Sequence, residues 1–415
     1  MTIDIDKTPT ARVQPALVRS LNLTLAVLFG LGVTIGAGIY VLIGATAGRA
    51  GMHAPLAFLL AGFVMAPTAA SFAEFASRMP VSAGEAAYVR AGFGSEQLAQ
   101  IIGLMVIAVG VVSAAAIAKG SAGYIREFVD LPTGIVIAGV VILMGAVAAL
   151  GILQSVAIAG LMTLIEIVGL LVIIFYGATK SPDVITRLPE IWIGLSNFAA
   201  VTGVLSASML AFFAFIGFEG LANIAEEVKD PQRTLPKAIF LTLAISTLFY
   251  ILVVWIALVS VPRDELAAAR APLSLVFQRV TGASPFAISA IAIVATVNGI
   301  IALMVMASRV IYGMADRNLL SSVFAAVSPR TRTPLNATAV VVAVVLVLAL
   351  TFPLEGLAET TSRLGLIIFA FVNAALVLLK RKDRPMDPGT FVVPIEVPFV
   401  GCVLCVALFA GAFFG

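Results

Sequence analysis

The sequence predicts an all-α integral membrane protein with about eleven transmembrane helices. Apolar residues make up 61% of the 415 residues and charged residues only 11%, and the mean hydropathy is +1.12. A soluble domain carries about 25% charged residues, so no water-soluble core can bury this much apolar surface. The apolar residues also gather in runs of about 20, the length that one helix needs to cross the hydrocarbon layer.

Long apolar runs define the expected spans in order along the chain. They lie at residues 22–48, 54–77, 97–118, 132–151, 155–178, 197–225, 236–260, 284–314, 335–352, 360–379 and 394–414. The sixth and eighth runs extend beyond the bilayer at their cytoplasmic ends. The connections are short, and none is rich enough in serine and glycine to act as a flexible linker. The chain is therefore expected to form a single transmembrane domain, residues 1–415.

The positions of the basic residues indicate the orientation of these spans. With the N-terminus in the cytoplasm, the inner segments hold 16 of the 25 lysines and arginines, and an excess of these residues marks the cytoplasmic side. The strongest single cue is the basic cluster at residues 380–384, after the tenth span. We therefore expect a multi-pass protein of the plasma or inner cell membrane with a cytoplasmic N-terminus. No cleaved signal peptide is expected, because the first span is too long for a signal core.

The first span is unusually rich in glycine near its centre, with Gly32, Gly36 and Gly38 close together. Glycine costs about 1 kcal/mol relative to alanine inside a helix, so such a cluster needs a reason. Gly32 and Gly36 have the spacing of four that suits close helix packing, whereas Gly36 and Gly38 do not share a face. Two interpretations stay open at this point. The glycines allow close packing, or they unwind the helix at mid-membrane.

The sixth span carries a second interruption, with Gly217 and Gly220 on either side of Glu219. Spans one and six lie five apart, so they cross the bilayer in opposite directions. Interrupted segments in corresponding places of two halves are typical of the substrate site of an inverted-repeat transporter. The pair of motifs therefore favours two broken helices over simple packing.

Broken helices at this depth predict a particular ligand chemistry. Irregular backbone survives in a membrane only where it lines a cavity. Freed amides near Gly36 and Gly38, at a half-helix N-terminus, suit a carboxylate. Freed carbonyls at residues 213–216 suit an ammonium group. A site with both ends fits a zwitterion, hence an amino acid, and Phe213, Phe215 and Phe218 are placed to close over its side chain.

Four stretches carry a resemblance to a known family. They are GVTIGAGIYVLIG in span one, FAEFASRMPVSAGEAAYV after span two, FFAFIGFEGLANIAEEVKDPQRTLPKAI through span six, and SRVIYGMADRNLL at the end of span eight. The chain resembles the amino acid–polyamine–organocation superfamily, and within it the bacterial amino acid permeases related to the cationic amino acid transporters. The span-six stretch is the most specific of the four, and the matches run over most of the chain.

The resemblance implies the five-plus-five inverted-repeat fold shared with the sodium-coupled leucine transporter. The first repeat is then residues 22–178, the second residues 197–379, and residues 394–414 form an extra terminal span. The implied substrate-binding residues are Thr34, Ile35, Gly36, Ala37, Gly38, Phe213, Ala214, Phe215, Ile216 and Gly217. Phe213 falls where relatives often place a gating aromatic. Ala37 offers no hydroxyl, so recognition in span one is expected through the backbone alone.

The sequence departs from the family pattern in two places. It ends after eleven spans where twelve are usual, and Arg317 and Asn318 replace the more usual acidic-glycine turn. The terminal helices lie outside the transport core, so we expect function to survive these differences.

Two glutamates lie inside predicted spans, Glu166 midway along span five and Glu219 in the break of span six. An ionised carboxylate at the bilayer centre costs about 3 kcal/mol on insertion scales. A protonated glutamate bonded to a neighbouring helix is the structural interpretation of Glu166, and a coupling site for a proton or another cation is the functional one. In relatives the comparable position often holds a lysine that stands in for a sodium ion. Glu219 is placed to respond to pH or to balance a cationic substrate.

The function expected from these observations is secondary active transport of amino acids by alternating access, coupled to protons through Glu166 and Glu219. The alternatives are an amino acid exchanger or uniporter and a polyamine transporter, and the preferred side chain stays open. An ion channel is disfavoured, because it needs a polar stripe along several helices or a repeated filter loop.

An enzyme is not expected, because the single histidine, His53, cannot supply a catalytic cluster. Cys402 and Cys405 have no further metal ligands nearby, so no metal or cofactor is expected. The net charge of +3 is too small to suggest nucleic acid. The expected partners are an amino acid, a coupling ion and the lipid bilayer.

Overall fold

The computed structural model describes residues 19–79, 84–151, 156–181, 183–194, 197–316, 320–382 and 389–411. Arg317 and Asn318, at the second departure from the family pattern, lie outside the described residues. Within these ranges the regular structure is helical, apart from one isolated bridge between Leu21 and Val228. The prediction of an all-α protein is confirmed.

The helices coincide with the predicted spans. Spans one to five are α1 (Leu23–Ala50), α2 (Ala54–Arg78), α4 (Glu96–Ile125), α5 (Thr133–Leu150) and α6 (Val156–Lys180). The sixth span begins with α8 (Phe198–Phe213). Spans seven to eleven are α10 (Pro231–Ser260), α13 (Phe286–Asp316), α14 (Leu335–Thr351), α15 (Leu354–Arg381) and α16 (Glu396–Gly411). By length and composition, seven helical stretches of the described chain can cross a membrane, and shorter apolar helices accompany them.

Short helices connect the spans. They are η1 (Gly51–His53), α3 (Gly84–Phe93), α7 (Asp183–Thr186), η2 (Leu188–Ile191), α9 (Gly220–Asn223), η3 (Ala225–Glu227), α11 (Arg263–Ala268), α12 (Pro272–Thr281) and η4 (Ser322–Ala325). Polar side chains fix where several long helices begin. Asn22, Ser95 and Asn197 each accept a hydrogen bond from the backbone N–H three residues later, which satisfies an otherwise unpaired donor in the first turn.

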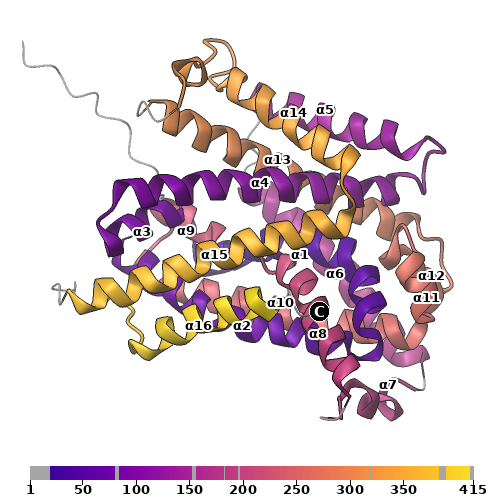
Figure 1. Cartoon of the computed structure of the whole chain (residues 1–415). Helices are drawn as coiled ribbons and strands as arrows, with labels where there is room; N and C mark the ends of the chain where they lie inside the picture. The colour runs from indigo at the N-terminus through magenta and orange to yellow at the C-terminus, as the bar shows by residue number, and fades with distance from the viewer. Residues whose placement is uncertain are drawn as a thin grey trace, which may run out of the picture.

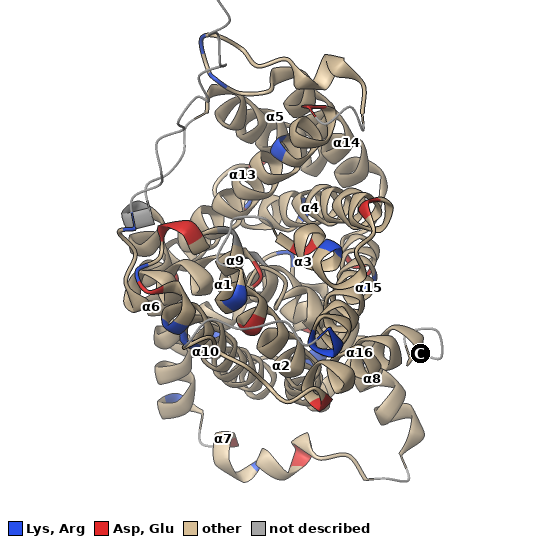
Figure 2. Ribbon diagram, turned by 90° about the vertical axis from the view of Figure 1, so that its left-hand side faces the viewer, with Lys and Arg blue, Asp and Glu red and all other residues tan. Residues whose placement is uncertain are grey.

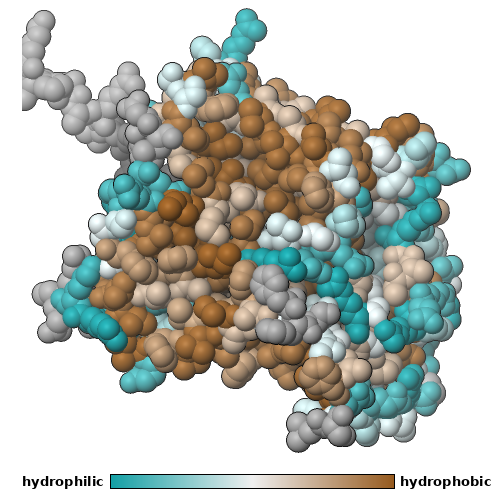
Figure 3. All heavy atoms as spheres, in the orientation of Figure 1, coloured by the Kyte–Doolittle hydropathy of each residue, from teal (hydrophilic) through white to brown (hydrophobic). Residues whose placement is uncertain are grey.

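The long helices pack into one bundle around α1 (Figure 1). α1 contacts α10, α8, α6 and α13, and α2 packs along α10. α4 packs between α13 and α15, and α14 lies beside α5. In the view of Figure 2, α1 lies among α6, α10 and α2. Figure 3 shows mostly apolar residues over the middle of the molecule and hydrophilic residues gathered toward two opposite sides, as a bilayer requires.

α1 corrects the prediction of a broken first span. It is a continuous helix from Leu23 to Ala50 and passes through both central glycines without interruption. The reason is close packing, because a Cβ atom added at Gly38 would overlap Cα of Ala214, and one added at Gly32 would overlap Oγ1 of Thr163. These glycines therefore let α1 approach its neighbours. The predicted break in the sixth span is confirmed, since α8 ends at Phe213 and the helix resumes only at Gly220.

A fully buried carboxylate ties α2, α15 and the segment before α16 together. The side chain of Glu74 is 0% exposed, and its oxygens pair with Arg78 and, at 2.7 Å, with Lys380. Oε2 of Glu74 also accepts a hydrogen bond of 2.8 Å from the N–H of Val393. Two cations and one amide thus compensate a single buried charge, which is the condition for burying it at acceptable cost.

Replacing Glu74 by glutamine is expected to destabilise the protein by about 3–5 kcal/mol, because Arg78 and Lys380 lose their buried counter-charge. A matched control is Glu96→Gln, which removes the partner of Arg90 from a pair whose side chains are 68% and 55% exposed. That loss is expected to stay below about 1 kcal/mol. Thermal unfolding of the purified protein in detergent measures the stability of both variants. Equal losses of stability would contradict the role of Glu74 as a buried counter-charge.

Candidate functional site

The sixth span unwinds because its chain switches hydrogen-bond pattern after Phe213. The N–H groups of Ala214, Phe215 and Ile216 donate to carbonyls three residues earlier, at 3.0, 3.0 and 3.2 Å, instead of four as in an α-helix. Gly217 then adopts φ +133°, which side-chain-bearing residues rarely adopt. Its N–H donates to Oε2 of Glu219 at 2.7 Å. The carboxylate of Glu219 therefore replaces the backbone carbonyl that would accept from this amide in an α-helix.

The turn at residues 214–219 lies directly against α1. Gly38 faces the backbone of Ala214, and a Cβ atom at Gly217 would lie 2.9 Å from the carbonyl oxygen of Val33. The two segments predicted to bind substrate, residues 34–38 and 213–217, are therefore neighbours in space although they are far apart in sequence.

Tyr250 of α10 bridges these two segments. Its buried hydroxyl lies 2.6 Å from the carbonyl oxygen of Thr34 and 2.7 Å from that of Ala214. Its ring packs edge-on against Phe58 and Phe215. Sequence reasoning missed Tyr250, although it is the only tyrosine of predicted span seven and so the one aromatic residue there with a hydroxyl.

The polar groups at this junction are unevenly satisfied. The Thr34 hydroxyl is buried and has no hydrogen-bond partner among the described residues. In the same part of the chain, no backbone hydrogen bond reaches the carbonyls of Phe215 or Ile216. The amides of Gly36 and Gly38 lie in a continuous helix and are used inside it. The junction thus offers one free hydroxyl and two free carbonyls, whereas the α1 amides predicted to hold a carboxylate are occupied.

Glu166 of α6 faces Gly36 of α1. The residue is 1% exposed, and neither carboxyl oxygen has a partner among the described residues. A Cβ atom at Gly36 would lie 3.9 Å from Oε2 of Glu166 and 3.6 Å from the carbonyl oxygen of Ala295 in α13. A buried carboxylate without a hydrogen bond or counter-charge is costly, so this group needs a proton or a cation.

Glu219 has a different environment. It is partly exposed and accepts the Gly217 amide, so its carboxyl belongs to the turn itself. α9, which follows it, packs on α3, the helix that carries Glu85 in its first turn. Glu85 is itself buried, and burial raises its pKa above the usual value for a glutamate. The two coupling candidates therefore lie in separate surroundings, Glu166 against α1 and Glu219 beside α3.

The aromatic residues around the turn are packed into the core. Phe215 contacts Tyr250 at a ring distance of 5.1 Å, and Phe218 contacts Phe72 and Phe369 at 5.5 and 5.7 Å. Phe213 is only 5% exposed. In this conformation the three phenylalanines expected to close over a substrate are therefore buried.

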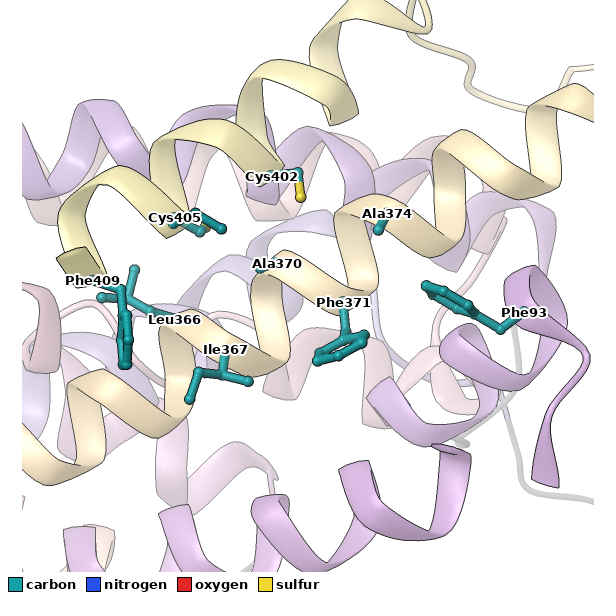
Figure 4. Close-up of a pocket in the computed structure, with 10 residues that line it drawn as sticks. Phe93, Leu366, Ile367, Ala370, Phe371, Ala374, Cys402, Cys405 and Phe409 are labelled. Carbon is teal, nitrogen blue, oxygen red and sulfur yellow. The ribbon is translucent and has the colours of Figure 1, made fainter. Parts of the chain in front are cut away.

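An apolar cavity of about 370 Å³ opens elsewhere, between α15 and α16 (Figure 4). Phe371 and Ile367 of α15 line it together with Cys402 and Phe409 of α16. None of the predicted site residues lines this cavity.

The comparison with known proteins gives the family. The model of the family described as "Amino acid permease" matches residues 26–413, which is nearly the whole chain. The chain belongs to the amino acid permease family. The resemblance identified from the sequence is confirmed, and the protein is an amino acid transporter of the multi-pass membrane type.

Three relatives of this permease have similar sequence identity to it but are named for different substrates. Human cationic amino acid transporter 4 is 29% identical over 403 residues, which cover 91% of this chain but only 62% of the human protein. The branched-chain amino acid permease BcaP of Bacillus subtilis is 29% identical over 421 residues, 95% of this chain and 88% of its own. The methylthioribose transporter of the same organism is 28% identical over 417 residues, 94% and 87%. Two are named as transporters and one as a permease, and none of the three as an enzyme.

Two glycine substitutions test which glycine of α1 is required for close helix packing. Gly38→Ala places a methyl group on the backbone of Ala214 and is expected to cost about 1–3 kcal/mol of stability through overpacking. Gly36→Ala meets only ordinary contacts beyond 3.5 Å and gains up to about 1 kcal/mol of helix propensity. Thermal unfolding in detergent should rank Gly38→Ala well below wild type and Gly36→Ala at or above it. The reverse order would contradict the described contact.

Proposed function

We propose that this permease takes up amino acids together with protons, by alternating access around α1 and the turn after α8. The observation that carries the proposal is the Glu166 carboxyl, which is buried, has no partner among the described residues and faces Gly36 of α1. Its position beside one wall of the candidate substrate site allows a proton on Glu166 and a substrate on α1 to depend on each other. The proposal includes a cytoplasmic N-terminus in the cell membrane.

The substrate is proposed to bind between residues 34–38 and residues 213–217. The carbonyls of the turn accept hydrogen bonds from the ammonium group, because the C-terminal end of α8 carries partial negative charge. The free hydroxyl of Thr34 is available to the carboxylate. These two segments open the two proposed repeats, residues 22–178 and 197–379, so a rocking motion of one repeat against the other changes the site from both sides.

Proton movement is proposed to couple to amino acid transport through protonation of the Glu166 carboxylate, which removes its negative charge. The ionised form costs about 3 kcal/mol or more at this depth, whereas the neutral acid is tolerated among apolar side chains. Loading a proton therefore allows the helices around Gly36 to close, and releasing it favours a conformation in which water reaches Glu166. Glu219 is the second candidate, because its carboxyl holds the Gly217 amide and with it the shape of the turn.

An apolar side chain is the proposed preference. Three phenylalanines lie in or next to the turn, Phe213, Phe215 and Phe218, and the Bacillus relative is named as a branched-chain amino acid permease. A cationic substrate, as the name of the human relative suggests, has Glu219 as a counter-charge beside the turn. L-Leucine and L-arginine are therefore the informative pair of substrates.

Uptake of labelled L-leucine, L-arginine and the other common amino acids into proteoliposomes tests the function, with and without a pH gradient that is acidic outside. The expected result is uptake of L-leucine that the gradient accelerates severalfold. Glu166→Gln is expected to transport without responding to the gradient, because glutamine mimics the protonated acid. Glu219→Gln is expected to weaken the response, and Glu96→Gln, an exposed change, to keep it.

The two alternative modes of amino acid transport have their own outcomes in this assay. Uptake that needs amino acid on the inside identifies an exchanger, and uptake indifferent to pH identifies a uniporter. An unchanged gradient response in both Glu166→Gln and Glu219→Gln removes these residues as coupling groups. No uptake or exchange of any amino acid overturns the proposed function.

A further inference from the structure

The junction of α1 and the turn after α8 has more hydrogen-bond acceptors than donors. Three oxygen atoms meet there, the hydroxyl of Tyr250 and the carbonyls of Thr34 and Ala214. A tyrosine hydroxyl carries a single proton, so it makes one full hydrogen bond at a time or shares a weaker one between two acceptors. The hydroxyl therefore cannot fully satisfy both carbonyls.

The two carbonyls differ in how much they need this hydroxyl. Thr34 lies inside the continuous helix α1, whose carbonyls also accept from amides one turn later. Ala214 lies beyond the end of α8, and Tyr250 is the donor to its carbonyl among the described residues. Tyr250 is fully buried, so exchange with water is restricted at this place. The Ala214 carbonyl thus depends on the tyrosine.

The electrostatics of the junction favour a cationic donor over a neutral one. The C-terminal end of a helix carries a partial negative charge from its unpaired carbonyls, and α8 ends here with the carbonyls of Phe215 and Ile216 also free of backbone partners among the described residues. A primary ammonium group has three N–H donors and a full positive charge. It satisfies this arrangement better than one hydroxyl proton does.

We propose that the Tyr250 hydroxyl is a placeholder for the substrate's ammonium group. In the empty carrier it donates to the Ala214 carbonyl and holds the turn against α1. When an amino acid enters, its ammonium group takes over this carbonyl and the tyrosine keeps only the Thr34 carbonyl. This inference rests on the proposed function and adds to it a positioning residue on α10, which stabilises the empty carrier rather than the loaded one.

A placeholder has a consequence that a purely structural tyrosine lacks. Its removal harms the empty carrier, in which Ala214 loses its donor, and spares the loaded carrier, in which the ammonium group replaces it. An unpaired buried carbonyl shifts an equilibrium by roughly five- to a hundredfold. Substrate binding should therefore become tighter, and a smaller fraction of the carrier should be empty at a given amino acid concentration. Net uptake should fall as a result, because it needs the empty carrier to return across the membrane.

The experiment compares wild type with Tyr250→Phe in equilibrium binding and in proteoliposome transport. The phenylalanine keeps the ring contacts with Phe58 and Phe215 and removes only the hydroxyl. We expect the Kd for L-leucine, or for L-arginine if the wild type prefers it, to fall at least about fivefold. Net uptake should fall while exchange of internal for external amino acid is retained.

Two controls separate the placeholder from general effects. The first is 4-methylpentanoate, which is L-leucine without its ammonium group, or 5-guanidinopentanoate for L-arginine, and its Kd should not change in Tyr250→Phe. The second is Tyr124→Phe, which removes another fully buried hydroxyl, one that donates to the carbonyl of Tyr40 and accepts from the Leu273 amide. It is expected to leave the Kd for the amino acid unchanged.

A Kd that is unchanged or weaker in Tyr250→Phe overturns the placeholder, as does an equal change for the analogue without the ammonium group. Loss of net uptake and exchange to the same extent also overturns it and indicates a purely structural tyrosine. Failure of the wild-type protein to bind any amino acid overturns the proposed function as well, which distinguishes the two failures.

Discussion

The contact between Gly38 of α1 and Ala214, just beyond α8, is the constraint on which the site depends. A side chain at position 38 would occupy the space of the Ala214 backbone, so only glycine lets these two segments meet. Because they meet, the carbonyls of Thr34 and Ala214 come within reach of one hydroxyl from α10. The polar junction in the middle of an apolar bundle is thus a consequence of a missing side chain.

The same close packing gives the buried glutamate its importance. α6 also lies against α1, with Gly32 facing Thr163 and Gly36 facing Glu166. With no partner for its oxygens among the described residues, Glu166 is stable in these surroundings only when a proton or a cation compensates it. Packing around α1 and the charge state of Glu166 therefore depend on each other, and this is the physical basis of the proposed proton coupling.

The sequence predicted the helices and the turn of span six because those features are local. Runs of about 20 apolar residues have the length of membrane-spanning helices. In span six, Gly217 adopts the unusual φ angle, and the side chain of Glu219, two residues later, accepts a hydrogen bond from the freed Gly217 amide. The family, too, followed from contiguous motifs and was confirmed by the match over residues 26–413.

The break expected in α1 and the role of Tyr250 depend on distant residues, and here sequence reasoning failed. A glycine that unwinds a helix and a glycine that admits a neighbour look the same in the sequence. Which one Gly38 is depends on Ala214, which reaches it only through the fold. Tyr250 sits in an apolar run with nothing beside it to mark a function, and its partners come from two other spans.

We propose above that an amino acid binds between α1 and the turn after α8. An experimental structure of the protein saturated with L-leucine, or with L-arginine if that is the transported substrate, tests it most directly. We expect density for the amino acid between Thr34 and the carbonyls of residues 214–216, with its ammonium group on the turn. Density only elsewhere, for example in the apolar cavity between α15 and α16, would contradict it.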